Sequence, residues 1–185
     1  MRETIAKLRG VVYRAACGLF RKNVVIGRGL KIYKKLRIEG PGRVSIGVDC
    51  IIDGIRGDSS QYVSIDTHSP DAAITIGDNV ALYAARISSK FSITIGNGAV
   101  IEEAGVVDTD FHHVDRGRGE PTSETAEKCR IDIGDNVFIG SRSVVMKGAR
   151  IGSNARIHPG AVVTLPVQPG ASVIGNPARA MPSRP

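Results

Sequence analysis

The chain has no tryptophan, and aromatic residues of all kinds make up only 4% of its 185 residues. A core without large rings has to be filled by Ile, Val and Ala, which favours a narrow and regular fold. Hydrophobic residues make up 42% of the chain and charged residues 23%, so the composition does not indicate disorder. The length allows one domain with a real core and is too short for two ordinary ones.

Long apolar runs and paired cysteines are also missing. No apolar run approaches 18 residues, which argues against a membrane-spanning helix. The stretch VVYRAACGLF, residues 11–20, has the length of a signal-peptide core, but Arg14 interrupts it and no good cleavage site follows. The cysteines are odd in number and show no C-x-x-C spacing: Cys17, Cys50 and Cys129. We therefore expect a reduced, cytoplasmic chain.

Acidic residues are almost absent from the first 22 positions, which hold six basic residues against Glu3, a net charge of +5 out of +7 for the whole chain. This imbalance predicts an anionic partner for the segment, either a phosphate-bearing ligand or a lipid surface. We do not expect nucleic acid. Apolar residues in the same segment step alternately by three and four, which predicts an amphipathic helix: Ile5, Leu8, Val12, Ala15 and Leu19. Two interpretations remain open, a helix that caps the fold and a helix that lies on a membrane surface.

A six-residue repeat decides the expected architecture. Branched residues recur every six positions without a slip at Ile133, Ile139, Val145, Ile151, Ile157 and Val163. A small or β-branched residue follows four positions after each. An earlier register runs through Ile95, Ile101 and Val107, and the dipeptide Ile-Gly recurs at positions 26, 46, 76, 95, 133, 139, 151 and 174.

A period of six does not fit a helix, because positions six apart lie on opposite helix faces. It fits a short extended segment whose branched residue points inward, followed by a corner of Gly, Asn or Asp. Three such segments close a triangular coil, and stacked coils bury a continuous stripe of Ile and Val. An antiparallel sandwich would instead show a period of two with irregularly spaced hairpins. The sequence therefore predicts an all-β fold, a parallel β-helix.

Two stretches carry a resemblance to a known family. IDIGDNVFIGSRSVVMKGARIG (residues 131–152) and ASVIGNPAR (171–179) resemble the hexapeptide-repeat acyltransferases. Among the subgroups, the chain is most similar to the maltose/galactoside acetyltransferases and to enzymes that acetylate capsule, colanic acid or O-antigen sugars. The resemblance runs from about residue 24 to residue 180. It implies a left-handed β-helix, acetyl-CoA as acyl donor, and a homotrimer whose active site is shared between chains.

We therefore expect an amphipathic helix at 1–22, a β-helix domain at 23–180 and a tail at 181–185. The interval from Ile95 to Ile133 is 38 residues, which predicts a long loop at about 109–130. That loop follows directly after VVDTDFHHVD, residues 106–115, which places two adjacent histidines among three aspartates. A long loop on a rigid scaffold is where functional residues are to be sought first.

Acyl transfer to a hydroxyl needs a general base, and histidine suits this role because its ordinary pKa lies near ~6.5. The resemblance assigns the base to His112, with Asp115 at the H-x-x-D position. If the extended strand continues through this stretch, residues 108, 110 and 112 share one side, which favours Asp110 as the residue that orients the imidazole. We expect Asp108 and His113 to form a solvated corner, with His113 and Asp115 acting at most on the acceptor.

The resemblance also implies a coenzyme A groove between subunits. The backbone N–H of Ser141 matches the oxyanion-binding position of the family. Gly160 and Thr164 match residues along the pantetheine arm, and Arg179 matches one that reaches the phosphates. Relatives often have Lys directly after that Thr, and here Leu165 replaces it. The 3′-phosphate is then held either by Arg179 and Arg184 or more weakly. The asparagine that binds the acceptor in the galactoside enzymes is replaced by Ala84, so the galactoside substrate is in doubt.

Three other functions were weighed. A γ-type carbonic anhydrase needs three spaced histidines. The chain has four histidines, and none of them are in H-x4-H spacing: His68, His112, His113 and His158. We therefore expect no metal site. An ice-binding or purely structural β-helix would show ranks of Thr-x-Thr, which are absent. The main alternative is an N-acetyltransferase of a nucleotide-linked amino sugar. We expect an acetyl-CoA-dependent O-acetyltransferase acting on a sugar hydroxyl of a bacterial surface polysaccharide or its precursor.

Overall fold

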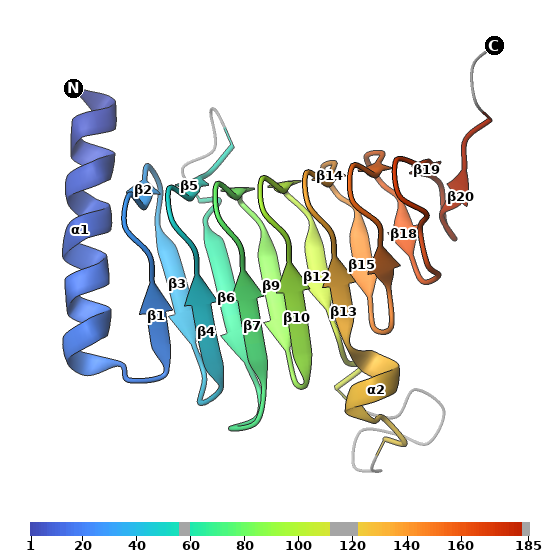
Figure 1. The fold of residues 1–185 in the computed structure, drawn as a ribbon, viewed down its shortest axis with the longest axis horizontal. Helices are drawn as coiled ribbons and strands as arrows, with labels where there is room; N and C mark the ends of the chain where they lie inside the picture. Colours follow the sequence, from blue (N-terminus) through green and yellow to red (C-terminus); the bar gives the residue numbers. More distant parts are fainter. Residues whose placement is uncertain (56–59, 112–121, 183–185) are drawn as a thin grey trace.

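The computed structural model describes residues 1–55, 60–111 and 122–182. A single helix is followed by twenty short strands that wind into a coil with three faces, and a four-residue helix interrupts the coil beside its longest loop (Figure 1). His112, His113, Asp115 and Arg184 lie outside the described residues. The roles expected of these four stay predictions.

The strands form three sheets, one on each face of the coil, and all pairs within them are parallel except the last. The first sheet contains β1 (Val24–Ile26), β4 (Arg43–Ile46), β7 (Ala73–Ile76), β10 (Ser92–Ile95), β13 (Ile131–Ile133) and β16 (Arg150–Ile151). The second contains β2 (Lys31–Ile32), β5 (Ile51–Asp53), β8 (Ala81–Tyr83), β11 (Val100–Glu102), β14 (Phe138–Ile139), β17 (Arg156–Ile157), β19 (Ser172–Ile174) and β20 (Arg179–Ala180). The third contains β3 (Leu36–Glu39), β6 (Val63–Thr67), β9 (Arg86–Ser89), β12 (Gly105–Val107), β15 (Val144–Met146) and β18 (Val162–Val163).

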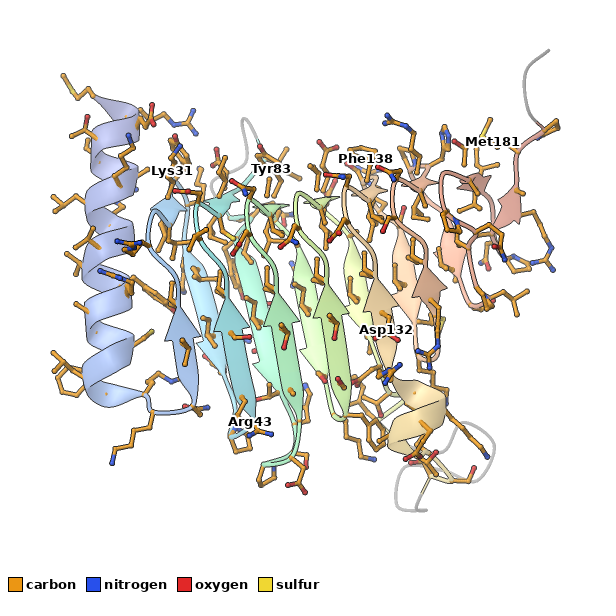
Figure 2. The ribbon with its side chains drawn as sticks, in the orientation of Figure 1. Lys31, Arg43, Tyr83, Asp132, Phe138 and Met181 are labelled. Atoms are coloured by element: carbon orange, nitrogen blue, oxygen red, sulfur yellow. The ribbon has the colours of Figure 1, made fainter. Side chains whose placement is uncertain are left out.

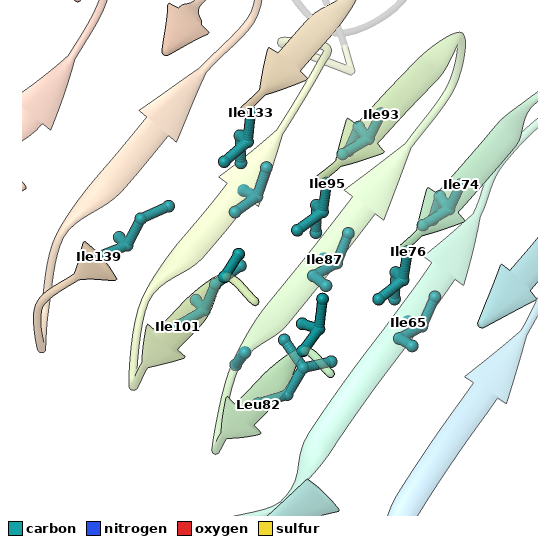
Figure 3. Packing of buried hydrophobic residues seen from close by; sticks show 14 of the residues in the cluster. Ile65, Ile74, Ile76, Leu82, Ile87, Ile93, Ile95, Ile101, Ile133 and Ile139 are labelled. Carbon is teal, nitrogen blue, oxygen red and sulfur yellow. The ribbon is translucent and has the colours of Figure 1, made fainter. Parts of the chain in front are cut away.

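Matching isoleucines stack through the centre of the coil. Ile76 pairs in register with Ile95 and Ile95 with Ile133, and all three are at most 2% exposed (Figure 3). Each such side chain contributes about 1.5–3 kcal/mol by leaving water. The recurring Ile-Gly dipeptide marks the corner that follows. At Gly96 an added Cβ would lie only 2.5 Å from the backbone carbon of Gly134 in the next coil, so stacked corners require glycine.

One expected register position is wrong. We expected Val107 to point inward, but Val106 is the fully buried residue and Val107 is half-buried. The step from Ile101 is therefore five residues. The turn before β12 closes tightly because Glu103 adopts a left-handed conformation, with φ of 44°. A shorter turn shifts the inward position by one residue because side chains alternate along a strand.

Helix α1 (Arg2–Phe20) lies across the N-terminal end of the coil and packs against β1 and β2 (Figure 1). The face that contacts the coil includes the buried small residues Ala6, Gly10 and Cys17 and the partly buried Tyr13. The predicted apolar face is turned away from the coil: Ile5, Leu8, Val12, Ala15 and Leu19. The four large residues of that face are 45–76% exposed.

Close approach explains why the small residues face inward. A Cβ at Gly10 would lie 1.8 Å from the carbonyl oxygen of Leu30, whereas a Cβ at Gly18 would meet nothing within 4 Å. We expect Gly10→Ala to lower the melting temperature, because the clash with backbone forces α1 away from the coil. Gly18→Ala is the matched control and should raise stability by about 0.5–1 kcal/mol through helix propensity alone. Equal melting shifts for the two variants would show that α1 does not cap the coil.

Candidate active site

The long loop leaves the coil after β12, at the corner that joins the third sheet to the first. This edge of the coil is called the loop corner here. Asp108, the first residue after β12, is fully buried. It accepts hydrogen bonds from Ser89 Oγ at 2.6 Å and from the backbone N–H groups of Lys90 and Phe91 at 2.7 and 3.0 Å. The expected solvated corner is therefore wrong for Asp108, which joins the loop root to the preceding coil.

Glu124 closes the loop onto its own root. Its carboxylate is 4% exposed and accepts hydrogen bonds from Thr109 Oγ1 and the Asp110 N–H, both at 2.8 Å, and from Thr122 Oγ1 at 2.9 Å. Lys147 Nζ, from the next coil, lies 3.2 Å from Glu124 Oε1. Burial alone would raise the pKa of Glu124, but these hydrogen bonds outweigh it and lower the pKa from 4.5 to about 2.

Lys147 links the two acidic groups at the loop root. Its ammonium also hydrogen-bonds the carboxylate of Asp110. Burial would lower the pKa of Lys147, but the hydrogen bonds to Asp110 and Glu124 raise it. The carboxylate expected to orient His112 is thus already engaged by a cation. The alternation that favoured Asp110 is also wrong, because β12 ends at Val107 and Phe111 has φ of 62°. The orienting role of Asp110 stays a prediction.

Sequence reasoning did not place His68 in this region. Its ring meets the ring of Phe111 edge-on, with centroids 4.8 Å apart, and its Nε2 is hydrogen-bonded to Ser88 Oγ at 2.8 Å. His68 follows β6, so it lies at the loop corner two coils before the loop. Phe111 directly precedes His112 in the chain. No periodic signal marks His68, because it belongs to a turn where the six-residue repeat is broken.

Ser141 lies at a different edge of the coil, where the second sheet joins the third. This edge is called the Ser141 corner. Figure 2 shows Phe138 of β14, in the second sheet, on the side of the coil opposite Arg43, which lies at the loop corner. Gly160, in the next coil, donates its N–H to the Ser141 carbonyl at 2.9 Å. Across the described part of the chain, no acceptor engages the Ser141 N–H. Ser141 and Gly160 are therefore together, as the resemblance implied.

The remaining residues assigned to coenzyme A lie around β18, in the last full coil. Ala178 donates its N–H to the Val162 carbonyl at 2.8 Å, which holds Arg179 beside this strand with its side chain exposed. Thr164 is exposed and follows β18, at the loop-corner end of the strand rather than beside Gly160. The structure thus brings Gly160 and Arg179 near the same strand and separates Thr164 from Gly160 by the length of β18.

Among residues 1–55, 60–111 and 122–182, no three His, Cys, Asp or Glu side chains are grouped to hold a metal ion. Ala84, at the position that binds the acceptor in galactoside enzymes, is 2% exposed and has φ of 50°. Asparagine adopts this left-handed conformation more readily than alanine. The backbone at Ala84 is therefore suited to asparagine, although the amide itself is missing.

Residues 130–164 match the family model described as bacterial transferase hexapeptide (six repeats). This chain is built on that repeat. Its resemblance to the hexapeptide-repeat acyltransferases is confirmed, and so is the predicted fold class, a left-handed parallel β-helix with an N-terminal helix and one extended loop.

The hexapeptide chain has relatives that acetylate oxygen and relatives that acetylate nitrogen. It is 34% identical over 110 residues to galactoside O-acetyltransferase from Escherichia coli (strain K12). The aligned residues cover 57% of this chain and 52% of that protein. It is 35% identical over 88 residues to a 2,3,4,5-tetrahydropyridine-2,6-dicarboxylate N-acetyltransferase from Staphylococcus aureus (strain JH9), covering 48% of this chain and 29% of that protein. The chain thus spans about half the length of the first relative and less than a third of the second.

Two solved structures share the fold. The polysialic acid O-acetyltransferase OatWY superposes with a TM-score of 0.66 at 20% identity, covering 85% of this chain and 72% of that one. The N-acyltransferase AntD from Bacillus cereus, as a mutant in complex with dTDP-4-amino-4,6-dideoxyglucose and coenzyme A, gives a TM-score of 0.63 at 17% identity, covering 92% and 88%. At these identities the likeness shows the fold alone.

Proposed function

We propose that the chain is an acetyl-CoA-dependent O-acetyltransferase that acts on a sugar hydroxyl of a bacterial surface polysaccharide or its precursor, in the cytoplasm. The observation that carries the proposal is the loop root. The insertion in the coil begins at the histidine pair, and its base is fixed by buried Asp108 and Glu124. A general base has to be held in a fixed position, because moving a catalytic group by about 1 Å lowers the rate roughly 100-fold.

In the proposed mechanism acetyl-CoA supplies the acetyl group as a thioester. His112 takes the proton from the acceptor hydroxyl, whose oxygen bonds to the carbonyl carbon. The Ser141 N–H donates to the carbonyl oxygen while negative charge develops on it. The carbon–sulfur bond then breaks, and His112 returns the proton to the leaving sulfur. Asp110 orients the imidazole, while His113 and Asp115 contact the acceptor. No step requires a metal.

The separation of the two corners supports a site shared between subunits of a homotrimer. Ser141 lies before β15 and Asp110 lies at the other end of the third sheet. A three-residue strand spans roughly 10 Å, so one chain places these groups too far apart to serve one acetyl carbon. A second copy can bring its Ser141 corner to the loop corner of the first. The trimer is itself a proposal.

A trimer should be visible in solution. We expect sedimentation equilibrium at micromolar concentration to give three times the chain mass of 19.6 kDa. Dilution should reduce activity in proportion to dissociation, because a lone chain lacks half of the site. A monomer with full activity would contradict the shared site.

Arg179 is proposed to hold the phosphates of coenzyme A. We expect Arg179→Ala to raise the KM for acetyl-CoA about tenfold or more, since a charge-assisted contact is worth roughly 1.5–3 kcal/mol. Arg43→Ala, which removes an exposed arginine near the other end of the coil, should leave this KM unchanged. Dephospho-coenzyme A should serve nearly as well if Leu165 has removed the usual contact to the 3′-phosphate. A strong preference for the intact coenzyme would assign that contact to another residue.

The experiment that tests the function is thiol release from acetyl-CoA in the presence of a panel of glycans. Release should depend on a carbohydrate acceptor, and that acceptor should gain the mass of one acetyl group. The alternative is N-acetylation of a nucleotide-linked amino sugar. The N-acetyltransferase among the relatives supports N-acetylation, and its printed substrate is a tetrahydropyridine dicarboxylate. It predicts acetylation of amino sugars only.

A further inference from the structure

We propose that the outer face of α1 docks on an anionic lipid surface while its inner face caps the coil. The two interpretations of the helix are thus both assigned, to opposite faces of one element. This inference concerns α1 alone and does not depend on the proposed acetyl transfer.

The outer face of α1 is apolar along its length except at the exposed Thr4. Leu8, Val12 and Leu19 lie about 180° from the buried residues at 100° per residue, and they are 64%, 60% and 76% exposed. No charged residue falls between them on this face. It is called the outer stripe, and its further members are exposed too: Ile5, Val11, Ala15 and Ala16.

This arrangement is the reverse of an ordinary surface helix, which turns its apolar stripe to the core and its charges to water. At Gly10 the inner face cannot take a large side chain, because an added Cβ would lie 1.8 Å from the carbonyl oxygen of Leu30. The outer stripe therefore stays exposed in the described chain. An exposed apolar face of this extent indicates an interaction surface.

The charges of α1 identify the partner. Basic residues lie on both margins of the outer stripe, with Lys7 and Arg14 on one side and Arg2 and Arg9 on the other. An apolar stripe between basic margins is the pattern of a helix that lies in a lipid interface. A second copy of α1 would instead bring like-charged margins together.

A pocket at one margin strengthens this assignment. Between α1 and the first coil lies a pocket of about 340 Å³. Its lining includes three basic residues, one acidic residue and one member of the outer stripe: Lys7, Arg14, Lys31, Asp49 and Val11. Glu3 pairs with both lysines, at 3.1 and 3.4 Å, whereas Arg14 has no ion pair within the described ranges. A lipid phosphate can therefore contact Arg14 while its acyl chains lie along the stripe.

The geometry favours a helix that lies flat on the surface. No helix in the described part of the chain is long and apolar enough to cross a membrane. Figure 1 shows α1 across the end of the coil, with its length along the strand direction. Docking through the outer stripe would therefore leave the coil projecting from the lipid surface, with the loop corner free.

The experiment is co-sedimentation of the full chain with vesicles of phosphatidylcholine, with and without phosphatidylglycerol. We expect binding to the anionic vesicles at low salt. The double variant Leu8→Ser/Val12→Ser should bind more than about tenfold more weakly, since it removes apolar area that lipid would bury. Ile174→Ser, which changes a 48% exposed apolar residue at the other end of the coil, should bind like the parent. All these side chains are exposed, so the melting temperatures should agree.

A second pair of variants tests the charge. Arg14→Gln should weaken binding to anionic vesicles about fivefold and Arg156→Gln should not, and added salt should remove the difference. Equal binding by the parent and the Leu8/Val12 variant would overturn the proposal. So would a fall in oligomer size on changing Leu8 and Val12 without vesicle binding by the parent, because a second copy would then cover the stripe. Acetyl transfer to a soluble glycan should be the same for the parent and the stripe variant.

Discussion

Replacement of His112 by alanine is expected to lower kcat by about 10²–10⁴-fold, the usual value of general-base assistance. Binding of acetyl-CoA should be nearly unchanged, because the coenzyme is assigned to Gly160 and Arg179, away from the loop. The parent profile of kcat/KM against pH should rise through the ordinary range of histidine, about 6.5. That rise should vanish in the variant.

His113→Ala is the matched control, since it removes the same group one residue away. We expect its kcat to stay within about tenfold of the parent, because the resemblance assigns the base to His112 and leaves His113 to the acceptor. A larger loss for His113 than for His112 would transfer the role to His113. The same measurement on His68→Ala covers the histidine found beside Phe111, and a loss of the size predicted for His112 would make His68 the base.

Replacement of Glu124 by alanine is expected to be the most destabilising single change at the loop. The side chain is 4% exposed, and its loss leaves the Asp110 N–H without its acceptor and removes one of the two carboxylates that Lys147 contacts. Breaking such a partly buried network costs about 2–4 kcal/mol. Activity should fall with it, because the loop root that carries His112 loses its closure. Thermal unfolding and the rate of proteolysis within the loop both measure the effect.

The same residue gives a pH dependence with a defined sign. The folded pKa of Glu124 is lowered from 4.5 to about 2, so its contribution to stability is complete above pH 4.5. That contribution is lost as the pH falls from 4.5 toward 2. Glu127→Ala, an exposed acid in α2 (Ala126–Cys129), should change neither stability nor its acid slope. If the Glu124 variant and the parent unfold alike in acid, the Glu124 carboxylate does not stabilise the loop root.

The fold could be predicted because the same pattern of inward branched residues and corner glycines recurs many times along the sequence. Ile95 and Ile133 each fill an inward position, and the glycine after each makes the stacked corner possible. Val107 was misplaced because the step from Ile101 to the inward Val106 is five residues. The preceding coil has the same short step, from Leu82 to Ile87, and both turns contain a left-handed residue, Ala84 or Glu103. The position of the loop was predictable as the longest gap in the repeat, from Ile95 to Ile133.

The contacts at the loop root could not be predicted, because each joins residues far apart without any period. Glu124 returns to Thr109 across the loop, and Asp108 reaches back to Ser89 in the preceding coil. The face of α1 that contacts the coil could not be predicted for a different reason. Apolar periodicity measures which face avoids water, whereas the face that meets the coil was chosen by closeness to the backbone of Leu30.

The most direct test of acetyl transfer to a sugar hydroxyl is the chemical stability of the product. Purified chain, acetyl-CoA and a surface glycan are incubated, and the product mass is recorded before and after mild hydroxylamine. The account predicts a gain of one acetyl group that hydroxylamine removes, as it removes an ester, and no gain with His112→Ala. An acetyl group that survives hydroxylamine, as an amide does, would contradict the account.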